Sequence, residues 1–144
     1  MQTTGQRMTA LLQDMVQDRL RYIMLKNLLE EQRTLLLKRN SEKLEKMSEE
    51  LINIYNLLSD SAKRRNACLS SLGVTTNTEG FNNLISKLDA EKKSKISQLL
   101  ADIKQQAQLC QQKNEINGII LQMQQDVILK LTNDNNVISG IYHP

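Results

Sequence analysis

The sequence predicts an all-α fold, an elongated antiparallel bundle of three long helices with a short helix before the third and coiled-coil-like packing. The only proline is Pro144, so no proline interrupts a helix before the last residue. Leu, Ile and Met supply most of the apolar bulk, whereas there is one Phe and no Trp. Apolar residues also recur in alternating steps of three and four, the spacing typical of helices that pack along a heptad seam.

The first helix is expected over residues 6–39. Its apolar stripe follows the 3-4 spacing through Met8, Leu12, Met15, Tyr22, Leu25, Leu29 and Leu36. Four further apolar residues widen this stripe, namely Leu11, Val16, Ile23 and Leu28. A wide stripe predicts contact with more than one neighbouring helix.

The second helix is expected over residues 41–72, and its heptad seam has no slip. The seam comprises Leu44, Met47, Leu51, Ile54, Leu58, Ser61, Arg65, Cys68 and Leu72. Asn40 and Ser41 are favourable N-caps, and Gly73 suits the left-handed residue that follows a helix end. Because the junction at Asn40-Ser41 is so short, the first two helices should be antiparallel neighbours.

A loop at residues 74–78 separates the third periodic stretch from the second helix, and Thr76 with Glu79 has capping-box spacing. The stretch breaks at the polar segment 89–95, which predicts a short helix over 79–88 and a long one over about 90–132. Unbroken, residues 79–132 would form a rod of about 80 Å against about 50 Å for each earlier helix. The surplus must therefore protrude or fold back. The stripe runs through Leu99, Ile103, Ala107, Cys110, Asn114, Asn117, Leu121, Ile128 and Leu131.

The domain division follows from where this pattern stops. Residues 1–136 are expected to form the helical bundle domain, and residues 137–144 an apolar C-terminal tail. The segment between Leu131 and Val137 is rich in Asn and favours turns over helix.

The charge pattern does not favour nucleic acid or a membrane as the partner. The net charge is +3, with both signs interspersed, and the densest basic segment is the triplet 63–65, which has no aromatic residues around it. The longest apolar run, residues 35–37, is too short to span a bilayer, and residues 1–7 are polar, unlike a signal peptide. Cys68 and Cys110 fall on apolar stripes and are interpreted as reduced core residues, which fits a cytoplasmic location.

Catalytic and cofactor-binding groups are not evident. The only histidine is His143, next to the last residue, where catalytic geometry is hard to maintain. The five glycines are scattered and form no phosphate-binding loop. We therefore predict no enzyme activity, no cofactor and no metal site, and expect the chain to hold a partner polypeptide.

The third stripe contains two asparagines and a glycine where apolar residues are expected. Asn114 and Asn117 lie on the stripe that Cys110 and Leu121 define, and Gly118 costs a helix interior about 1 kcal/mol relative to Ala. One interpretation is that buried amides fix the pairing of helices and that the glycine allows close backbone approach. The other is that these residues form part of a partner-binding groove or a hinge.

The segment Ile103-x3-Ala107-x2-Cys110-x3-Asn114-x2-Asn117-Gly118-x2-Leu121 resembles the Asn-x2-Asn-Gly core of the FlgN family. The order and length of the helices are also similar over almost the whole chain. The resemblance implies a cytoplasmic flagellar export chaperone that binds terminal helices of the hook-associated proteins FlgK and FlgL. It would prevent their premature assembly and deliver them to the flagellar type III export apparatus.

Partner-binding residues are expected in two places. One group lies on the third helix at Asn114, Asn117, Gly118 and Leu121, and the other lies in the tail at Val137, Ile138, Ile141 and Tyr142. The tail residues are apolar and have no evident partner within the chain, a feature of interaction sites. The chain is expected to be a monomer or a weak dimer. The alternative function is a self-associating coiled-coil protein without an export role.

Overall fold

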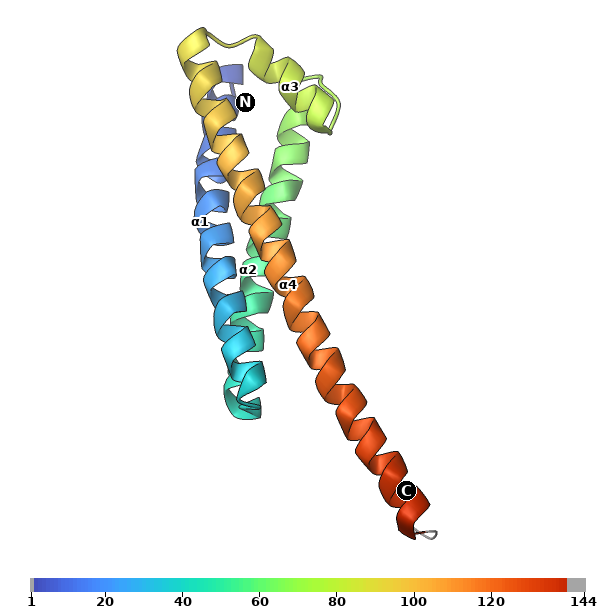
Figure 1. The fold of residues 1–144 in the computed structure, drawn as a ribbon. Helices are drawn as coiled ribbons and strands as arrows, with labels where there is room; N and C mark the ends of the chain where they lie inside the picture. Colours follow the sequence, from blue (N-terminus) through green and yellow to red (C-terminus); the bar gives the residue numbers. More distant parts are fainter. Residues whose placement is uncertain (1, 140–144) are drawn as a thin grey trace.

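The computed structural model describes the backbone of residues 2–139 and the side chains of residues 2–132. It contains four helices, α1 (Thr4–Leu37), α2 (Ser41–Ser71), α3 (Thr78–Ser86) and α4 (Ala90–Ser139), as shown in Figure 1. The described part of the chain has no strands. The predicted all-helical bundle of long helices is confirmed, with the short α3 preceding α4.

The helix boundaries follow from local capping. Asn40 caps α2 as predicted, because its side chain accepts a hydrogen bond from the backbone N–H of Lys43. Gly73 has the expected left-handed backbone, with φ +78°. The capping box predicted at Thr76 is wrong, because the residue that caps α3 is Asn77, whose Oδ1 accepts from the backbone N–H of Gly80 at 2.9 Å.

The fourth helix is longer than the sequence predicts. It continues to Ser139, about two turns past the expected end near 132, in spite of the asparagines between them. Residues 137–139 of the expected apolar tail therefore lie in α4, and residues 140–144 lie outside the described residues. Low local helix propensity did not end the helix, since propensity is a weak prior over a few residues.

Helices α2 and α4 run in opposite directions along α1. Arg64 of α2 binds Asp14 and Ser61 binds Asp18, so residue numbers fall on one helix as they rise on the other. That order is antiparallel, as predicted for the first two helices. Against α4 the order is parallel, because Tyr22, Leu29 and Leu36 each contact a residue 88 positions later. The expectation of an antiparallel arrangement is therefore correct for α1 with α2 and wrong for α1 with α4.

Helix α1 is the centre of the molecule, and both long helices pack on it. The wide stripe predicted on the first helix is confirmed in this respect, although Val16 is 48% exposed and lies on its outer side. Figure 1 shows α4 crossing α2 and then diverging from it, and α4 continuing well past the α1–α2 turn. The surplus length of the third periodic stretch therefore protrudes.

Buried side chains form two apolar clusters along α1. The upper cluster, near α3 in Figure 1, comprises Leu11, Met15, Leu69, Phe81, Leu84, Ile85 and Ile96. The lower cluster comprises Leu25, Leu29, Leu35, Met47, Leu51, Ile54 and Cys110. Phe81 on the short α3 fills the space between α2 and α4 at the upper end only.

The heptad seam predicted on α2 is confirmed, because each of its nine residues is buried or partly buried. The stripe predicted on α4 is only partly correct after Ile103. Its members Ala107, Cys110 and Asn117 are buried or partly buried, whereas Asn114, Leu121, Ile128 and Leu131 are exposed. The other partly buried positions from there to Gln124 are Gln106, Leu109, Lys113, Ile120 and Gln124. The face of α4 that contacts α1 is thus more polar than the stripe that the sequence suggested.

A helix that crosses a membrane must be both long and apolar. Among the described residues, none of the helices combines the length and the apolar character needed to cross a bilayer.

Candidate binding surfaces

The lower half of α4 is attached to α1 through polar side chains. Asn117 is 4% exposed, and its Nδ2 donates to the Leu29 carbonyl at 2.8 Å and to Gln32 Oε1 at 2.9 Å. Its Oδ1 accepts from Arg33 Nε at 3.2 Å. All the main hydrogen-bonding groups of this buried amide are therefore satisfied, which removes the penalty that an unpaired amide would incur. We name the set Gln106, Lys113, Asn117 and Gln124 the polar seam.

Two other members of the polar seam, Lys113 and Gln124, also bind α1. Lys113 pairs with Glu30 at 2.9 Å, and Gln124 Nε2 donates to the Leu36 carbonyl at 2.8 Å. Two buried atoms along this contact, Arg33 Nη2 and Gln106 Oε1, have no hydrogen-bond partner within the described part of the protein. Hydrogen bonds of this kind give positional specificity and little net stability.

The sequence-predicted residues on α4 are not brought together into one site. Asn117 is engaged by α1, so it positions the helix, as the helix-pairing interpretation proposed. Asn114 is exposed, and a Cβ built on Gly118 would have no neighbour within 4 Å, so close backbone approach at Gly118 is wrong. Leu121 is 45% exposed and available to a partner.

The predicted residues near the C-terminus are only partly described. Val137 and Ile138 lie in α4, beyond the last described side chain. Ile141 and Tyr142 lie outside the described residues altogether.

Close backbone approach occurs instead at Gly80. A Cβ at this position would lie 1.8 Å from the Thr75 carbonyl oxygen, so only glycine lets the 73–77 loop pack on α3. The capping-box spacing of Thr76 and Glu79 gives no sign of this constraint, because it concerns only side chains that precede the glycine.

The lower half of α4 carries an exposed apolar surface. Eight large apolar side chains, each 43–62% exposed, make up what we name the α4 apolar surface: Ile116, Ile119, Leu121, Met123, Val127, Ile128, Leu129 and Leu131. Ile116, Ile119, Met123 and Val127 have the spacing of one helix face. Among the described side chains, Gln124 makes the last polar contact with α1, at Leu36 near the end of that helix, so the part of α4 that follows extends beyond the hairpin. Exposed apolar groups of this density mark sites of interaction with other proteins.

A buried polar network separates the two apolar clusters. Asp18 is 4% exposed and Ser61 is fully buried, and the Ser61 hydroxyl donates to Asp18 Oδ2 at 2.7 Å. Arg21 donates to the other carboxylate oxygen at 2.9 Å, and Arg65 approaches Oδ2 at 3.4 Å. The carboxylate is thus paired and hydrogen-bonded, the condition under which a buried charge is tolerated.

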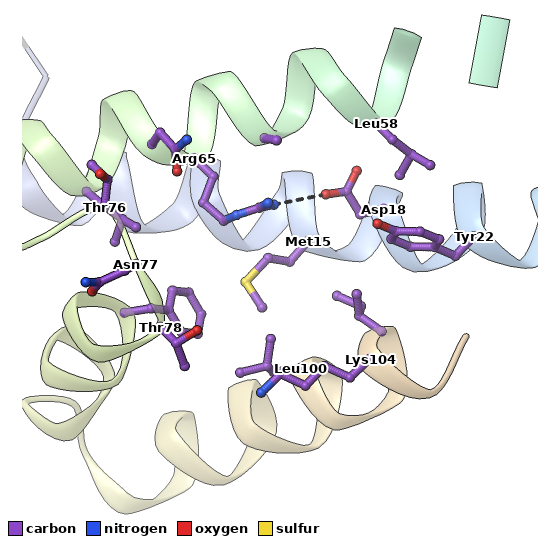
Figure 2. A pocket seen from close by; sticks show the side chains of 15 residues that line it. Met15, Asp18, Tyr22, Leu58, Arg65, Thr76, Asn77, Thr78, Leu100 and Lys104 are labelled. Carbon is purple, nitrogen blue, oxygen red and sulfur yellow. Dashed lines mark hydrogen bonds and ion pairs between the residues drawn. The ribbon is translucent and has the colours of Figure 1, made fainter. Parts of the chain in front are cut away.

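A cavity of about 350 Å³ lies beside this network, between α1, α2, α4 and the start of α3. We name it the junction pocket, and its walls include Met15, Tyr22, Arg65, Phe81, Ile103 and Lys104. Figure 2 shows Arg65 on α2 pointing toward Asp18, with Lys104 on α4 across the cavity. Burial, followed by the nearby Asp18 charge, raises the pKa of Tyr22 on the cavity wall.

Sequence reasoning missed the junction pocket, although one signal was present. Ser61 and Arg65 are consecutive polar positions in the otherwise apolar α2 seam. Such an interruption indicates a polar layer, but its partners on α1 and α4 depend on how the helices pack.

The two cysteines are free, as expected. Cys110 is buried, its Sγ donates to the Tyr22 carbonyl at 3.2 Å, and burial raises the pKa of its thiol. Within the described residues no group of three or more His, Cys, Asp or Glu side chains is placed to hold a metal ion.

These features define an all-helical protein with an exposed apolar surface on its last helix. Comparison with known families identifies the family to which this chain belongs. The FlgN family model, described as FlgN protein, matches residues 6–134, and the chain therefore belongs to the FlgN family of flagellar export chaperones. Comparisons with curated proteins and with solved structures find no match.

Proposed function

We propose that the protein is a cytoplasmic chaperone that binds the hook-associated proteins FlgK and FlgL, prevents their premature assembly and delivers them to the flagellar type III export apparatus. Membership of the FlgN family supports the export-chaperone class. The single observation that carries client binding is the α4 apolar surface, which continues past the α1–α2 turn.

The chemistry of this surface suits an amphipathic client helix. Side chains at i, i+3 and i+4 spacing on one helix face offer the pattern that another apolar helix face can pack against. Met123 is 62% exposed, and a methionine adapts its unbranched side chain to different partners. Leu121 and the predicted tail residues Val137, Ile138, Ile141 and Tyr142 belong to the same proposed client-binding region.

The test places charge on this surface. We expect Met123→Glu combined with Val127→Glu to weaken FlgK and FlgL binding at least about tenfold, because each carboxylate would lose its water in the complex. Both residues are exposed in the free chain, so helicity and thermal stability should be retained. Calorimetric titration with each client measures the affinity.

The matched control adds the same charge elsewhere on α4. Gln105→Glu with Gln125→Glu changes two exposed residues outside the α4 apolar surface and should leave affinity within about twofold. Absence of binding by the wild-type chain at micromolar concentration would refute the proposed clients. If sedimentation instead shows that the wild type self-associates through Met123 and Val127, the chain is a self-associating coiled-coil protein.

A further inference from the structure

The junction pocket lies between α2 and α4, at a position that no long helix of the bundle occupies. At the upper end α3 occupies the space between α2 and α4, and its Phe81, Leu84 and Ile85 complete the upper cluster. The helix is only nine residues long, and it begins at the pocket wall. Below this point α2 and α4 both pack on α1 without packing extensively on each other. The junction pocket is therefore a gap between α2 and α4 beside the start of α3, above the lower cluster in which Cys110 of α4 packs with residues of α2.

The pocket walls are apolar on the inner side. Met15 from α1, Leu69 from α2 and Phe81 from α3 are each less than 10% exposed and border the cavity. Leu100 and Ile103 extend this wall onto α4. A cavity of about 350 Å³ is within the size range of ligand-binding sites and has room for a few apolar side chains.

The charged groups at the pocket are unbalanced. Asp18 is the only acidic residue on its walls, and Ser61, Arg21 and Arg65 already bind its two oxygens. Arg65 and Lys104 are the two basic wall residues, and among the described side chains Lys104 forms no ion pair within 4 Å. The pocket thus has net positive charge around an apolar interior, which favours an occupant with a carboxylate.

We propose that the junction pocket binds one turn of an acidic, amphipathic helix of the client, which lies beside the start of α3. Apolar client side chains pack against Met15, Phe81 and Ile103, and a client carboxylate pairs with Lys104. The proposal rests on the proposed function and adds a second contact, separate from the α4 apolar surface, with stated client chemistry.

Substitution of Lys104 tests the electrostatic part of the proposal separately from the steric part. We expect Lys104→Glu to weaken client binding about five- to tenfold at about 0.05 M salt, with a smaller effect near 0.5 M because salt screens exposed charges. The matched control is Lys92→Glu, the same change on an exposed residue of α4 outside the pocket, which should stay within about twofold. Calorimetric titration of the full chain with full-length FlgK and FlgL measures both.

A larger side chain on the pocket wall tests the steric part of the proposal. Ala62→Phe should fill part of the cavity and weaken binding at least about tenfold, whereas Ala67→Phe, on an exposed part of α2 away from this pocket, should have little effect. Circular dichroism and thermal melting establish that each variant is folded. If Ala62→Phe does not fold, the salt-dependent effect of Lys104→Glu decides the question.

The outcomes separate this proposal from the function on which it rests. If the wild type binds a client and the Met123/Val127 double variant loses binding, but Lys104→Glu and Ala62→Phe bind normally, the pocket proposal alone is wrong. If the wild type binds neither client, both fail. If the pocket variants alter self-association in sedimentation and leave client affinity unchanged, a second copy occupies the pocket and the proposal is overturned.

Discussion

Gly80 and Gly118 both lie inside helices, but their surroundings are opposite. At Gly80 the backbone of Thr75 occupies the place of a side chain, and the contact involves a carbonyl that cannot rotate away. At Gly118 the corresponding space is open. The sequence does not distinguish these two helical glycines, and only the packing of the 73–77 loop does.

Alanine at these two positions should therefore change stability in opposite directions. Gly118→Ala should raise the free energy of unfolding by about 0.5–1 kcal/mol, because alanine restricts the unfolded chain and favours helix. Gly80→Ala should lower it by about 1–3 kcal/mol, because the overpacked loop must shift. Urea denaturation followed by circular dichroism measures both changes, and a gain in stability for Gly80→Ala would contradict the close contact with Thr75.

The partners of the buried Asp18 could not be predicted from the sequence. Its carboxylate lies between two apolar clusters that α1 shares, and its partners Ser61 and Arg65 are on another helix. Polar residues on a predicted apolar seam indicate that a partner exists. They do not identify it, since pairing depends on the register of α1 against α2.

At the level of single helices, α2 could be predicted from sequence and α4 could not. The α2 seam buries leucine, isoleucine and methionine, so hydrophobic periodicity locates its buried face directly. On α4 the buried face includes Gln106, Lys113 and Gln124, and many leucines and isoleucines face outward. Periodicity therefore pointed to a neighbouring stripe, because it assumes that apolar residues are the buried ones.

The polar seam gives a prediction that contrasts two asparagines on one helix. Asn117→Ala should lower the free energy of unfolding by about 1–3 kcal/mol, since it removes three hydrogen bonds and leaves Arg33 without its partner. Asn114→Ala removes an exposed amide and should change stability by less than about 0.5 kcal/mol. Chemical denaturation of both variants checks this, and equal effects would mean that Asn117 does not position α4.

The whole molecule is organised around α1, which contacts both long helices. The sequence predicted this from the width of the apolar stripe on the first helix. It did not predict that α4 would run parallel to α1, because that direction depends on α3, which crosses the upper end and starts α4 near the N-terminus (Figure 1). A short helix thus decides the direction of a long one.

This arrangement predicts a gradient of backbone protection. Amides in α1 between Leu11 and Leu36 should exchange slowly with solvent deuterium, because both apolar clusters include side chains from this segment. Amides of α4 after Gln124 should exchange fastest among the helices, since that segment extends past its last contact with α1. Hydrogen–deuterium exchange with mass spectrometry measures the gradient, and client addition should slow exchange at this end. Slow exchange up to Ser139 in the free chain would mean that another surface covers α4.

The placement of the tyrosines has a spectroscopic consequence. The chain has no Trp and three Tyr, so its near-ultraviolet emission comes from tyrosine alone. Tyr22 borders the junction pocket, and burial raises the pKa of Tyr55, with Cys110 close by on α4. Tyr22 therefore lies where an incoming helix would change its polarity and quenching, whereas Tyr55 is 44% exposed. The tyrosine fluorescence of the unlabelled protein should therefore change when a helix occupies the space between α2 and α4.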